Sequence, residues 1–409
     1  MVRFQSVRVR PSPARHRRYR FALVRAALFA CAAAIALPAP LAAQTASTWW
    51  QQNGGRIHLA DDPNRPVVLL LHGIGGAGSG FFKPSDDKSG INGFYYDHRA
   101  RPAEIHRRAG NPGIGVLRIA PSPRSATKTD ANNFFDYLIK QRFTVATWTQ
   151  PGTMFADAYR SAVTALDILV RDTKGPIALV GHSRGGLIVR KLLKDGGDRG
   201  GRIRWAIMLH SPNQGSELPR VGVELTSGIA RAIDALPLPA SMKSTLHNSL
   251  GGDAARFTAA YVISPAEQEM IPGSPLLRDL ATNEKPLPGV RYYTFGGTSP
   301  VMVRYFAWTY TASSAKPHIT CSSPTDCTTH YEHDIRPIEI PLLSPFLGGQ
   351  PRIVPEITPG LGDGLVADAR ARLPFARHFT RALNHPEGVL DPGIHRDVTL
   401  ILNGQEPRP

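Results

Sequence analysis

Ser183 is the residue best placed to act as a nucleophile. It stands at the centre of a Gly-x-Ser-x-Gly segment, residues 181–185, with an apolar run typical of a buried strand before it and a helical pattern after it. A serine on such a sharp strand-to-helix turn exposes its hydroxyl, and the flanking glycines are needed because side chains there would clash with the neighbouring strand and helix. The alternative is a glycine-rich helix start that contains an incidental serine.

A serine hydroxyl needs a base, a carboxylate that orients the base, and an oxyanion hole. Asp363 lies between two glycines on an expected turn, and His385 lies in a loop before the expected last helix. The order serine, acid, histidine is one that serine hydrolases use. We therefore expect Asp363 and His385 to complete a triad with Ser183, with His395 as the alternative base and Asp368 or Asp391 as alternative acids.

The segments around these residues alternate between strands and helices. Mostly apolar runs, typical of strands buried on both faces, occur at 66–71, 143–148, 176–180, 203–209 and 291–297. Helical patterns occur at 155–172, 187–194 and 395–402. This alternation predicts an α/β fold, in which a mostly parallel sheet carries helices on both faces.

Three regions interrupt the alternation and are expected to be insertions at strand ends. They are 75–130, 217–272 and 300–356. Long insertions at strand ends are usually lids or binding loops. Apolar residues spaced by three and four within 217–272 favour an amphipathic lid over an apolar site, and a helix packed on the core is an equally good interpretation.

The ordered motifs resemble the α/β-hydrolase superfamily, and within it the bacterial triacylglycerol lipase and esterase branch. The resemblance covers about 66–216 and 275–404 and excludes most of the insertions. Four segments carry it: His72-Gly-Ile-Gly75 is similar to the oxyanion loop, Gly181-His-Ser-Arg-Gly185 to the nucleophile turn, Ser211-Pro-Asn-Gln-Gly215-Ser to the turn after the next strand, and Asp363-Gly-Leu-Val366 with Asn384-His385 to the acid and histidine loops.

This resemblance implies an α/β-hydrolase fold with a helical lid and a role for each matching residue. Ser183 would be the nucleophile, His385 the base and Asp363 its orienter, with the backbone N–H groups of Ile74 and Arg184 as the oxyanion hole. The implied reaction is ester hydrolysis through an acyl-enzyme, with no metal and no organic cofactor.

Two positions depart from the family pattern. Arg184 replaces an uncharged residue after the nucleophile, so its side chain is expected either to restrict the acyl pocket or to recruit a buried acid. Asn213 stands where histidine is usual, which is expected to affect packing only. Neither change removes a catalytic group.

The expected activity is that of a lipase or carboxylesterase on acyl esters or lipids, with transient contact with a lipid interface. A polyester depolymerase or an amide-cleaving enzyme with the same triad is the main alternative, and a non-catalytic scaffold on this fold is a weaker one. No nucleic-acid partner is expected. The only basic cluster outside the N-terminal segment, 99–108, lacks the patch character of nucleic-acid binders and is interpreted as a solvated loop.

The first 43 residues are expected to be a bacterial signal peptide. They hold eight arginines and no acidic residue, and so supply half of the net charge of +16. A twelve-residue apolar run at 26–37 is too short to cross a ~30 Å bilayer core as a helix, and small residues follow it. We expect cleavage after Ala43, export to the periplasm or medium by the general or twin-arginine route, no later membrane segment, and one catalytic domain over 44–409.

Removal of that segment leaves two cysteines, Cys321 and Cys327. In an exported chain, two cysteines six positions apart most simply form one local disulfide. A metal site with the surrounding residues His318, His330 and His333 and Asp334 is the alternative, although the spacing matches no usual structural zinc pattern. Free thiols are the remaining possibility.

Overall fold

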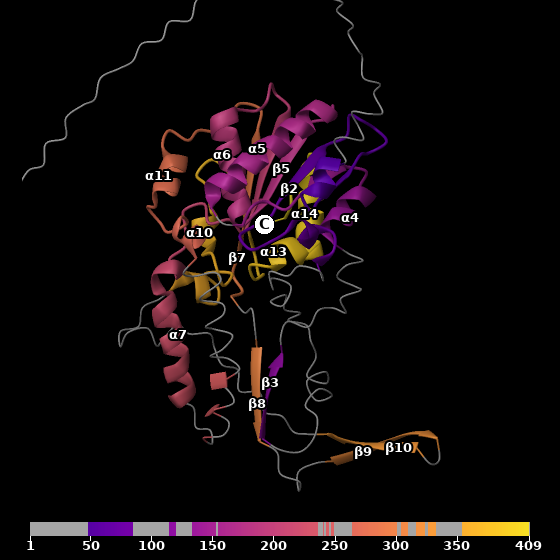
Figure 1. The fold of residues 1–409 in the computed structure, drawn as a ribbon, viewed down its shortest axis with the longest axis vertical. Helices are drawn as coiled ribbons and strands as arrows, with labels where there is room; N and C mark the ends of the chain where they lie inside the picture. Colours follow the sequence, from indigo (N-terminus) through magenta and orange to yellow (C-terminus); the bar gives the residue numbers. More distant parts are fainter. Residues whose placement is uncertain are drawn as a thin grey trace, which may run out of the picture.

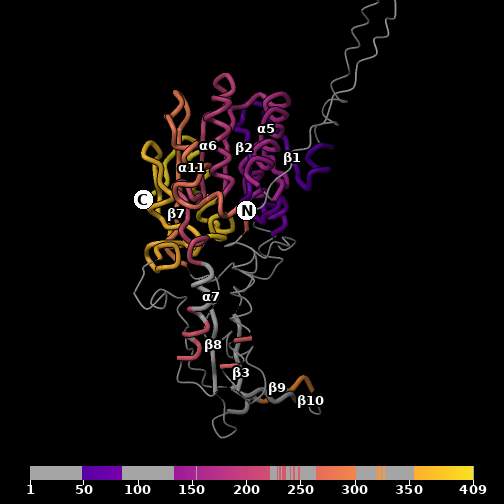
Figure 2. The backbone as a smooth tube through the Cα atoms, turned by 60° about the vertical axis from the view of Figure 1, so that its left-hand side comes forward, coloured from indigo at the N-terminus to yellow at the C-terminus, as the bar shows by residue number. Residues whose placement is uncertain are grey.

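The computed structural model places a central sheet with helices above two smaller sheets (Figures 1 and 2). It describes residues 48–84, 114–119, 133–152, 154–235, 240, 243–244, 247–248, 264–300, 304–309, 316–323, 326–332 and 354–408. The predicted signal peptide and the basic cluster at 99–108 lie outside these residues.

Seven strands form the central sheet, in the order β1-β4-β2-β5-β6-β7-β11. Every neighbouring pair is parallel except β1 with β4. All five predicted strands belong to this sheet. The strands are β1 (Arg56–His58), β2 (Val67–Leu71), β4 (Thr144–Thr147), β5 (Ile177–His182), β6 (Ile203–Leu209), β7 (Arg291–Gly297) and β11 (Arg377–Arg381).

The helices connect these strands or follow them. Helix α5 has the predicted bounds, while α6 and α14 each begin three residues before their predicted starts. The helices are α4 (Phe134–Lys140), α5 (Phe155–Asp172), α6 (Arg184–Gly196), α7 (Leu218–Ala235), α10 (Pro265–Gln268), α11 (Pro275–Ala281), α12 (Asp368–Ala371), α13 (Glu387–Leu390) and α14 (Pro392–Leu402), with 3₁₀ turns η1 (Gly78–Phe81) and η7 (Pro355–Ile357).

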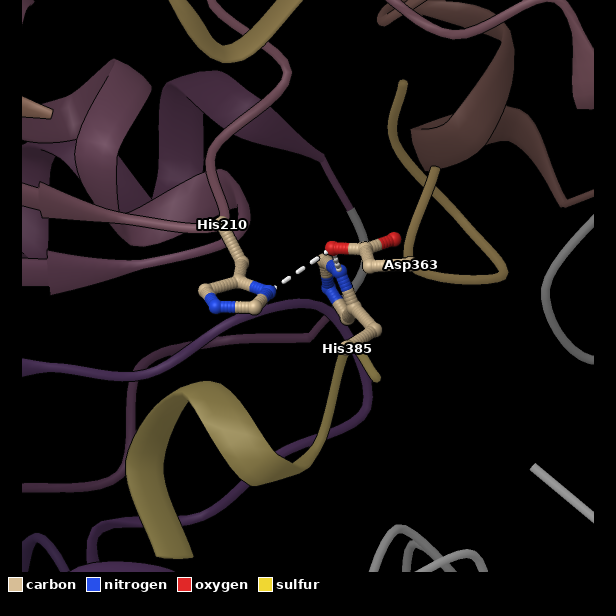
Figure 3. Close-up of side chains that lie close together, drawn as sticks. All are labelled: His210, Asp363 and His385. Carbon is tan, nitrogen blue, oxygen red and sulfur yellow. Dashed lines mark hydrogen bonds and ion pairs between the residues drawn. The ribbon is translucent and has the colours of Figure 1, made fainter. Parts of the chain in front are cut away.

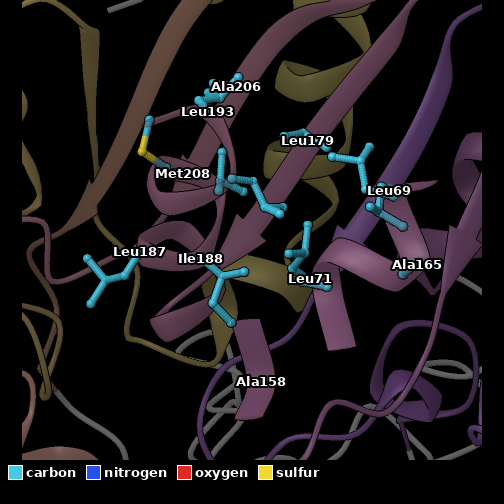
Figure 4. Close-up of a cluster of buried hydrophobic side chains, with 14 of the residues drawn as sticks. Leu69, Leu71, Ala158, Ala165, Leu179, Leu187, Ile188, Leu193, Ala206 and Met208 are labelled. Atoms are coloured by element: carbon cyan, nitrogen blue, oxygen red, sulfur yellow. The ribbon is translucent and has the colours of Figure 1, made fainter. Parts of the chain in front are cut away.

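Successive side chains of a strand point to opposite faces of the sheet, and helices bury both faces. In β2, Leu69 and Leu71 pack with α5 and α6, whereas Val68 and Leu70 pack with α4 and α14. Figure 4 shows Leu69 and Leu71 in the first of these two clusters. Each such side chain contributes about 1.5–3 kcal/mol by burial. The predicted fold class, a mostly parallel sheet with helices on both faces, is confirmed.

Two small antiparallel sheets lie in the predicted insertions, and Figure 1 shows them, with α7, beyond one end of the central sheet. Strand β3 (Ile114–Ile119) pairs with β8 (Arg304–Thr309), so the first and third insertions contact each other. Strands β9 (Lys316–Ser323) and β10 (Asp326–Glu332) form a hairpin. Its two cysteines, Cys321 and Cys327, are joined by a disulfide, so their sulfur atoms are not free to bind a metal as thiolates.

Helix α7 occupies the start of the predicted lid region. Its side chains at Leu218, Val221 and Ile233 are buried. Most of 236–263 lies outside the described residues, so the lid remains a prediction. Among the residues that the structure describes, no helix is both long and apolar enough to cross a membrane.

Candidate active site

Ser183 is held in a strained conformation between the end of β5 and the start of α6. Its backbone has φ 54° and ψ −125°, in the left-handed region that side chains rarely adopt. The turn packs tightly on β2, since a Cβ at Gly185 would lie 2.3 Å from the carbonyl oxygen of Leu71. The half-buried Ser183 side chain is thus presented at the carboxyl edge of the sheet, and the predicted need for glycine beside it is confirmed.

Asp363 and His385 meet through a direct hydrogen bond. The His385 Nδ1 atom lies 2.8 Å from Oδ2 of Asp363, and the backbone N–H of His385 donates to the Asp363 carbonyl at 2.9 Å (Figure 3). Because a carboxylate only accepts, the ring carries its proton on Nδ1, and in the neutral ring Nε2 keeps a lone pair. That is the tautomer a general base for a serine hydroxyl requires.

The charge of Asp363 is strongly stabilised although its side chain is buried. Burial by itself would raise the pKa of Asp363, but the charge of His385 and hydrogen bonds from two imidazoles outweigh it and hold this pKa below its usual range. The Oδ1 atom accepts from the backbone N–H groups of Leu365, at 2.9 Å, and Val366, at 2.7 Å. Asp363 is therefore a fixed anion at neutral pH.

His182 ties the histidine loop to the nucleophile turn. Its Nε2 atom donates to the carbonyl oxygen of His385 at 2.9 Å, and the two ring centroids are 4.8 Å apart. Burial, and then the charges of His385 and His210, hold the pKa of His182 well below its ordinary value, so this ring is neutral. His385 therefore lies next to the residue that directly precedes Ser183.

The loop after β2 lies against Ser183 from the other side. A Cβ at Gly73 would lie 3.2 Å from Ser183 Oγ. The buried His72 donates from Nδ1 to the Gly73 carbonyl at 2.7 Å and accepts at Nε2 from the N–H of Gln150 at 2.8 Å. Burial lowers the pKa of His72 to about 4, against the opposing effect of the Gly73 hydrogen bond.

These contacts fix the direction of the N–H group of Ile74. The Gly73 carbonyl is directed toward His72, and in a trans peptide the following N–H points the opposite way. Among the residues that the structure describes, neither the N–H of Ile74 nor that of Arg184 has an acceptor. Both N–H groups are therefore unused donors within the described residues.

The side chain of Arg184 is fully buried and points away from its own N–H group toward the loop after β4. Its guanidinium donates to the carbonyl oxygens of Pro151, at 3.1 Å, and Gly152, at 3.4 Å. Burial lowers the pKa of Arg184, and the nearby charges of Glu267 and Glu269 oppose this. Burial also raises the pKa of Glu267 to about 8, with Arg184 opposing the shift. The hydrogen-bond partners of the guanidinium are main-chain carbonyl oxygens, so both expectations for Arg184 stay predictions.

The alternative residues lie elsewhere in other hydrogen-bond networks. His395 stacks on Phe134 with ring centroids 4.5 Å apart and bonds the Val389 carbonyl through Nε2. Asp391 accepts from the N–H of Gly393 and caps α14.

Asp368 and Asn213 also have structural partners. Asp368 accepts from His378 at 3.0 Å and from Arg372 at 2.7 Å. Asn213 donates to the Ala371 carbonyl at 2.6 Å, which fits the expected packing role.

His210 belongs to the site and was missed at the sequence level. It follows β6, is fully buried, and lies with Nδ1 2.9 Å from Oδ2 of Asp363. Its place at the carboxyl end of a parallel strand, where functional side chains gather, was the available signal. The ligand atoms of His210, Asp363 and His385 lie within 4.8 Å of one another, a grouping that is also compatible with a metal ion. The two hydrogen bonds to Asp363 already explain why these three side chains lie together.

Comparisons with known proteins give structural matches only. No protein-family model matches the chain, and no curated protein matches its sequence. Among solved structures, the mature form of the Bacillus licheniformis lipase BlEst2 is 16% identical with a TM-score of 0.43, over 84% of this chain and 94% of that one.

Two further structures match less well. The metagenomic carboxyl esterase MGS0156 is 13% identical with a TM-score of 0.37, over 80% of this chain and 66% of that one. A hydrolase from Pseudomonas aeruginosa is 12% identical with a TM-score of 0.34, over 86% and 93%. Because these three TM-scores are below 0.5, the similarities assign no chemistry to the site.

Proposed function

We propose that the protein is a carboxylic ester hydrolase, a lipase or carboxylesterase, that works through an acyl-enzyme. The observation that carries this proposal is the Asp363–His385 pair. Its hydrogen bond directs His385 Nε2 to be the basic atom, and His182 holds its loop beside Ser183. A nucleophile, a base, an oriented carboxylate and two free N–H groups are the parts that acyl transfer requires.

Acylation begins when the Ser183 oxygen attacks the ester carbonyl and His385 takes the hydroxyl proton. The carbonyl oxygen becomes an oxyanion, and the N–H groups of Ile74 and Arg184 stabilise it, each typically by ~3 kcal/mol. Asp363 stabilises the imidazolium without taking a proton itself. His385 then gives its proton to the departing alcohol, which leaves Ser183 acylated.

Deacylation repeats these steps with water. His385 removes a proton from water, the hydroxide attacks the acyl carbonyl, and the proton returns to the Ser183 oxygen as the acid leaves. Each step moves one proton between His385 and an oxygen atom. The sequence of steps requires no metal or organic cofactor.

We propose further that 217–272 is a lid that sets the preferred acyl length. The two ends of this insertion meet, since the N–H of Ser216 donates to the Met270 carbonyl at 2.9 Å. Glu269 also accepts from the N–H of Phe155 and must stay in any shortened chain. A linker in place of 218–263 is expected to change the ratio of activity on long and short acyl chains, and an unchanged ratio would exclude the lid.

The proposed location is outside the inner membrane. The expected signal peptide at 1–43 and the Cys321–Cys327 disulfide support it, because disulfides persist in oxidising compartments.

The test of the activity is hydrolysis of p-nitrophenyl esters from acetate to palmitate. The protein is expected to release p-nitrophenol with a burst, and Ser183→Ala is expected to release none above background. Ser322→Ala, in the β9–β10 hairpin, is the matched control and should keep wild-type activity. A fluorophosphonate probe should transfer its phosphonyl group to Ser183 with loss of HF, and the peptide that contains Ser183 should gain the mass of the probe less HF. Absence of turnover together with absence of labelling would exclude the proposed function, and polymer and amide substrates would then be tested.

A further inference from the structure

The Asp363 carboxylate has no acceptor position left. Oδ2 receives N–H groups from His210 at 2.9 Å and His385 at 2.8 Å, and Oδ1 receives two backbone N–H groups. A carboxylate has about four lone-pair sites, so all of them are in use. The base of the proposed reaction therefore shares its orienting oxygen with a second imidazole.

His210 donates to Asp363 from one ring nitrogen, and its other ring nitrogen has no partner among the described residues. Its Nδ1 carries a proton because it faces a carboxylate oxygen, and its Nε2 is buried with no hydrogen-bond partner among the described residues. A Cβ at Gly388 would lie 2.6 Å from Cδ2 of this ring, so backbone closes that side. A proton on Nε2 would have no acceptor among the described residues, and an unsatisfied buried donor is costly, so the ring keeps its Nδ1–H tautomer.

The titratable groups around His210 come from three other elements. Asp363 lies on the loop after η7, His385 precedes α13 with ring centroids 6.1 Å away, and His182 ends β5 with centroids 6.5 Å away. Asp363 is the only anion among these three groups. Its Oδ2 atom is therefore shared between two imidazole donors, which hold the carboxylate from two sides.

We propose that His210 is a positioning residue that fixes the Asp363 carboxylate in the place where it orients His385. This inference rests on the proposed function. A fixed carboxylate keeps the base in the productive tautomer and orientation.

Two substitutions separate hydrogen bonding from packing. His210 has φ 50°, a conformation that asparagine tolerates better than most residues. His210→Asn keeps an N–H donor at about the place of Nδ1. His210→Leu has nearly the same size and shape as the asparagine variant but cannot donate.

The expected results differ between the two variants. His210→Leu should lower kcat by roughly tenfold to a hundredfold with little change in KM, which is the usual effect of losing one hydrogen bond to a charged group. His210→Asn should restore kcat to within a few-fold of wild type. Equal losses in both variants would show that His210 only packs the core.

A second measurement does not depend on ester turnover. Imidazole N–H protons that are hydrogen-bonded to a carboxylate resonate far downfield in proton NMR spectra, and the wild-type protein should show two from this cluster. His210→Leu should remove one and shift the other. Retention of both resonances, or no shift of the second, would overturn the proposal. If the wild-type protein shows both downfield resonances but has no esterase activity, the proposed function is wrong and the arrangement around Asp363 is not.

Discussion

Replacing Asp363 with asparagine tests most directly whether Asp363 is the acid that orients His385. The backbone N–H groups of Leu365 and Val366 both point at Oδ1, so the amide oxygen of an asparagine would take that position. Its NH₂ group would then occupy the place of Oδ2 and donate its two hydrogens to the Nδ1 atoms of His210 and His385. The His210 ring would then carry its proton on the buried Nε2, which has no acceptor among the described residues, so the protein is expected to fold with its stability lowered by about 1–3 kcal/mol.

The substitution is expected to lower the catalytic rate because both imidazoles must change tautomer. A His385 ring that accepts at Nδ1 carries its proton on Nε2 and cannot remove a proton from Ser183. The same substitution at the triad acid of a well-studied serine protease lowers kcat about 10⁴-fold, which corresponds to roughly 5.5 kcal/mol. We expect a loss of that order here, with the fluorophosphonate reaction at Ser183 slowed in parallel.

The assay is single-turnover acylation by p-nitrophenyl butyrate, with Asp368→Asn as the matched control. Asp368 also accepts from an imidazole, His378, at 3.0 Å and lies five residues further along. The control should keep kcat within a few-fold. An Asp363→Asn protein that is folded and keeps more than about a tenth of wild-type kcat would refute Asp363 as the orienting acid.

Three further predictions concern stability and processing. Ser183→Gly should unfold at a higher temperature than Ser183→Ala in calorimetry, because glycine relieves a positive φ that costs of order 1–3 kcal/mol, and an equal Tm would argue against strain at the turn. Burial raises the pKa of Glu267 to about 8, so the folded protein holds this proton more tightly than the unfolded chain does. The free energy of unfolding should therefore fall as the pH rises from about 4.5 to 8. Glu267→Gln should flatten that dependence in denaturant titrations and gain up to roughly 5 kcal/mol at pH 8, whereas parallel profiles would exclude the raised pKa. The protein recovered from the periplasm or medium of an expressing bacterium should begin at Gln44 by mass spectrometry, and an uncleaved chain would refute the signal peptide.

The sequence predicts those strands whose side chains are all or nearly all buried. In β2 all five side chains are buried, so the run is continuously apolar and easy to recognise. Strand β11 has one apolar residue, Phe379, within Arg377–Arg381, and no run marks it. Its formation depends on parallel pairing with β7 and on stacking of Phe379 on Phe295, with ring centroids 5.2 Å apart. Neither contact is local in the sequence.

The site divides in the same way. The Ser183 turn has a local pattern because its glycines are required by contacts with adjacent elements. The order of Asp363 and His385 suggested their pairing, but only the fold brings their loops together. His210 lies 153 positions from Asp363 and has no local pattern of its own. The pairing of β3 with β8 was missed for the same reason, since it joins two insertions from distant parts of the chain.

The neutral imidazole of His72 has a consequence for the energetics of turnover. Its two hydrogen bonds hold one peptide group after β2 in a single orientation in the free protein. The entropy of aligning that donor is therefore lost once, during folding, and is not lost again with every substrate molecule. In the proposed reaction, little solvent or backbone reorganisation would then accompany the appearance of negative charge, which would lower the barrier without tightening the binding of the uncharged ester.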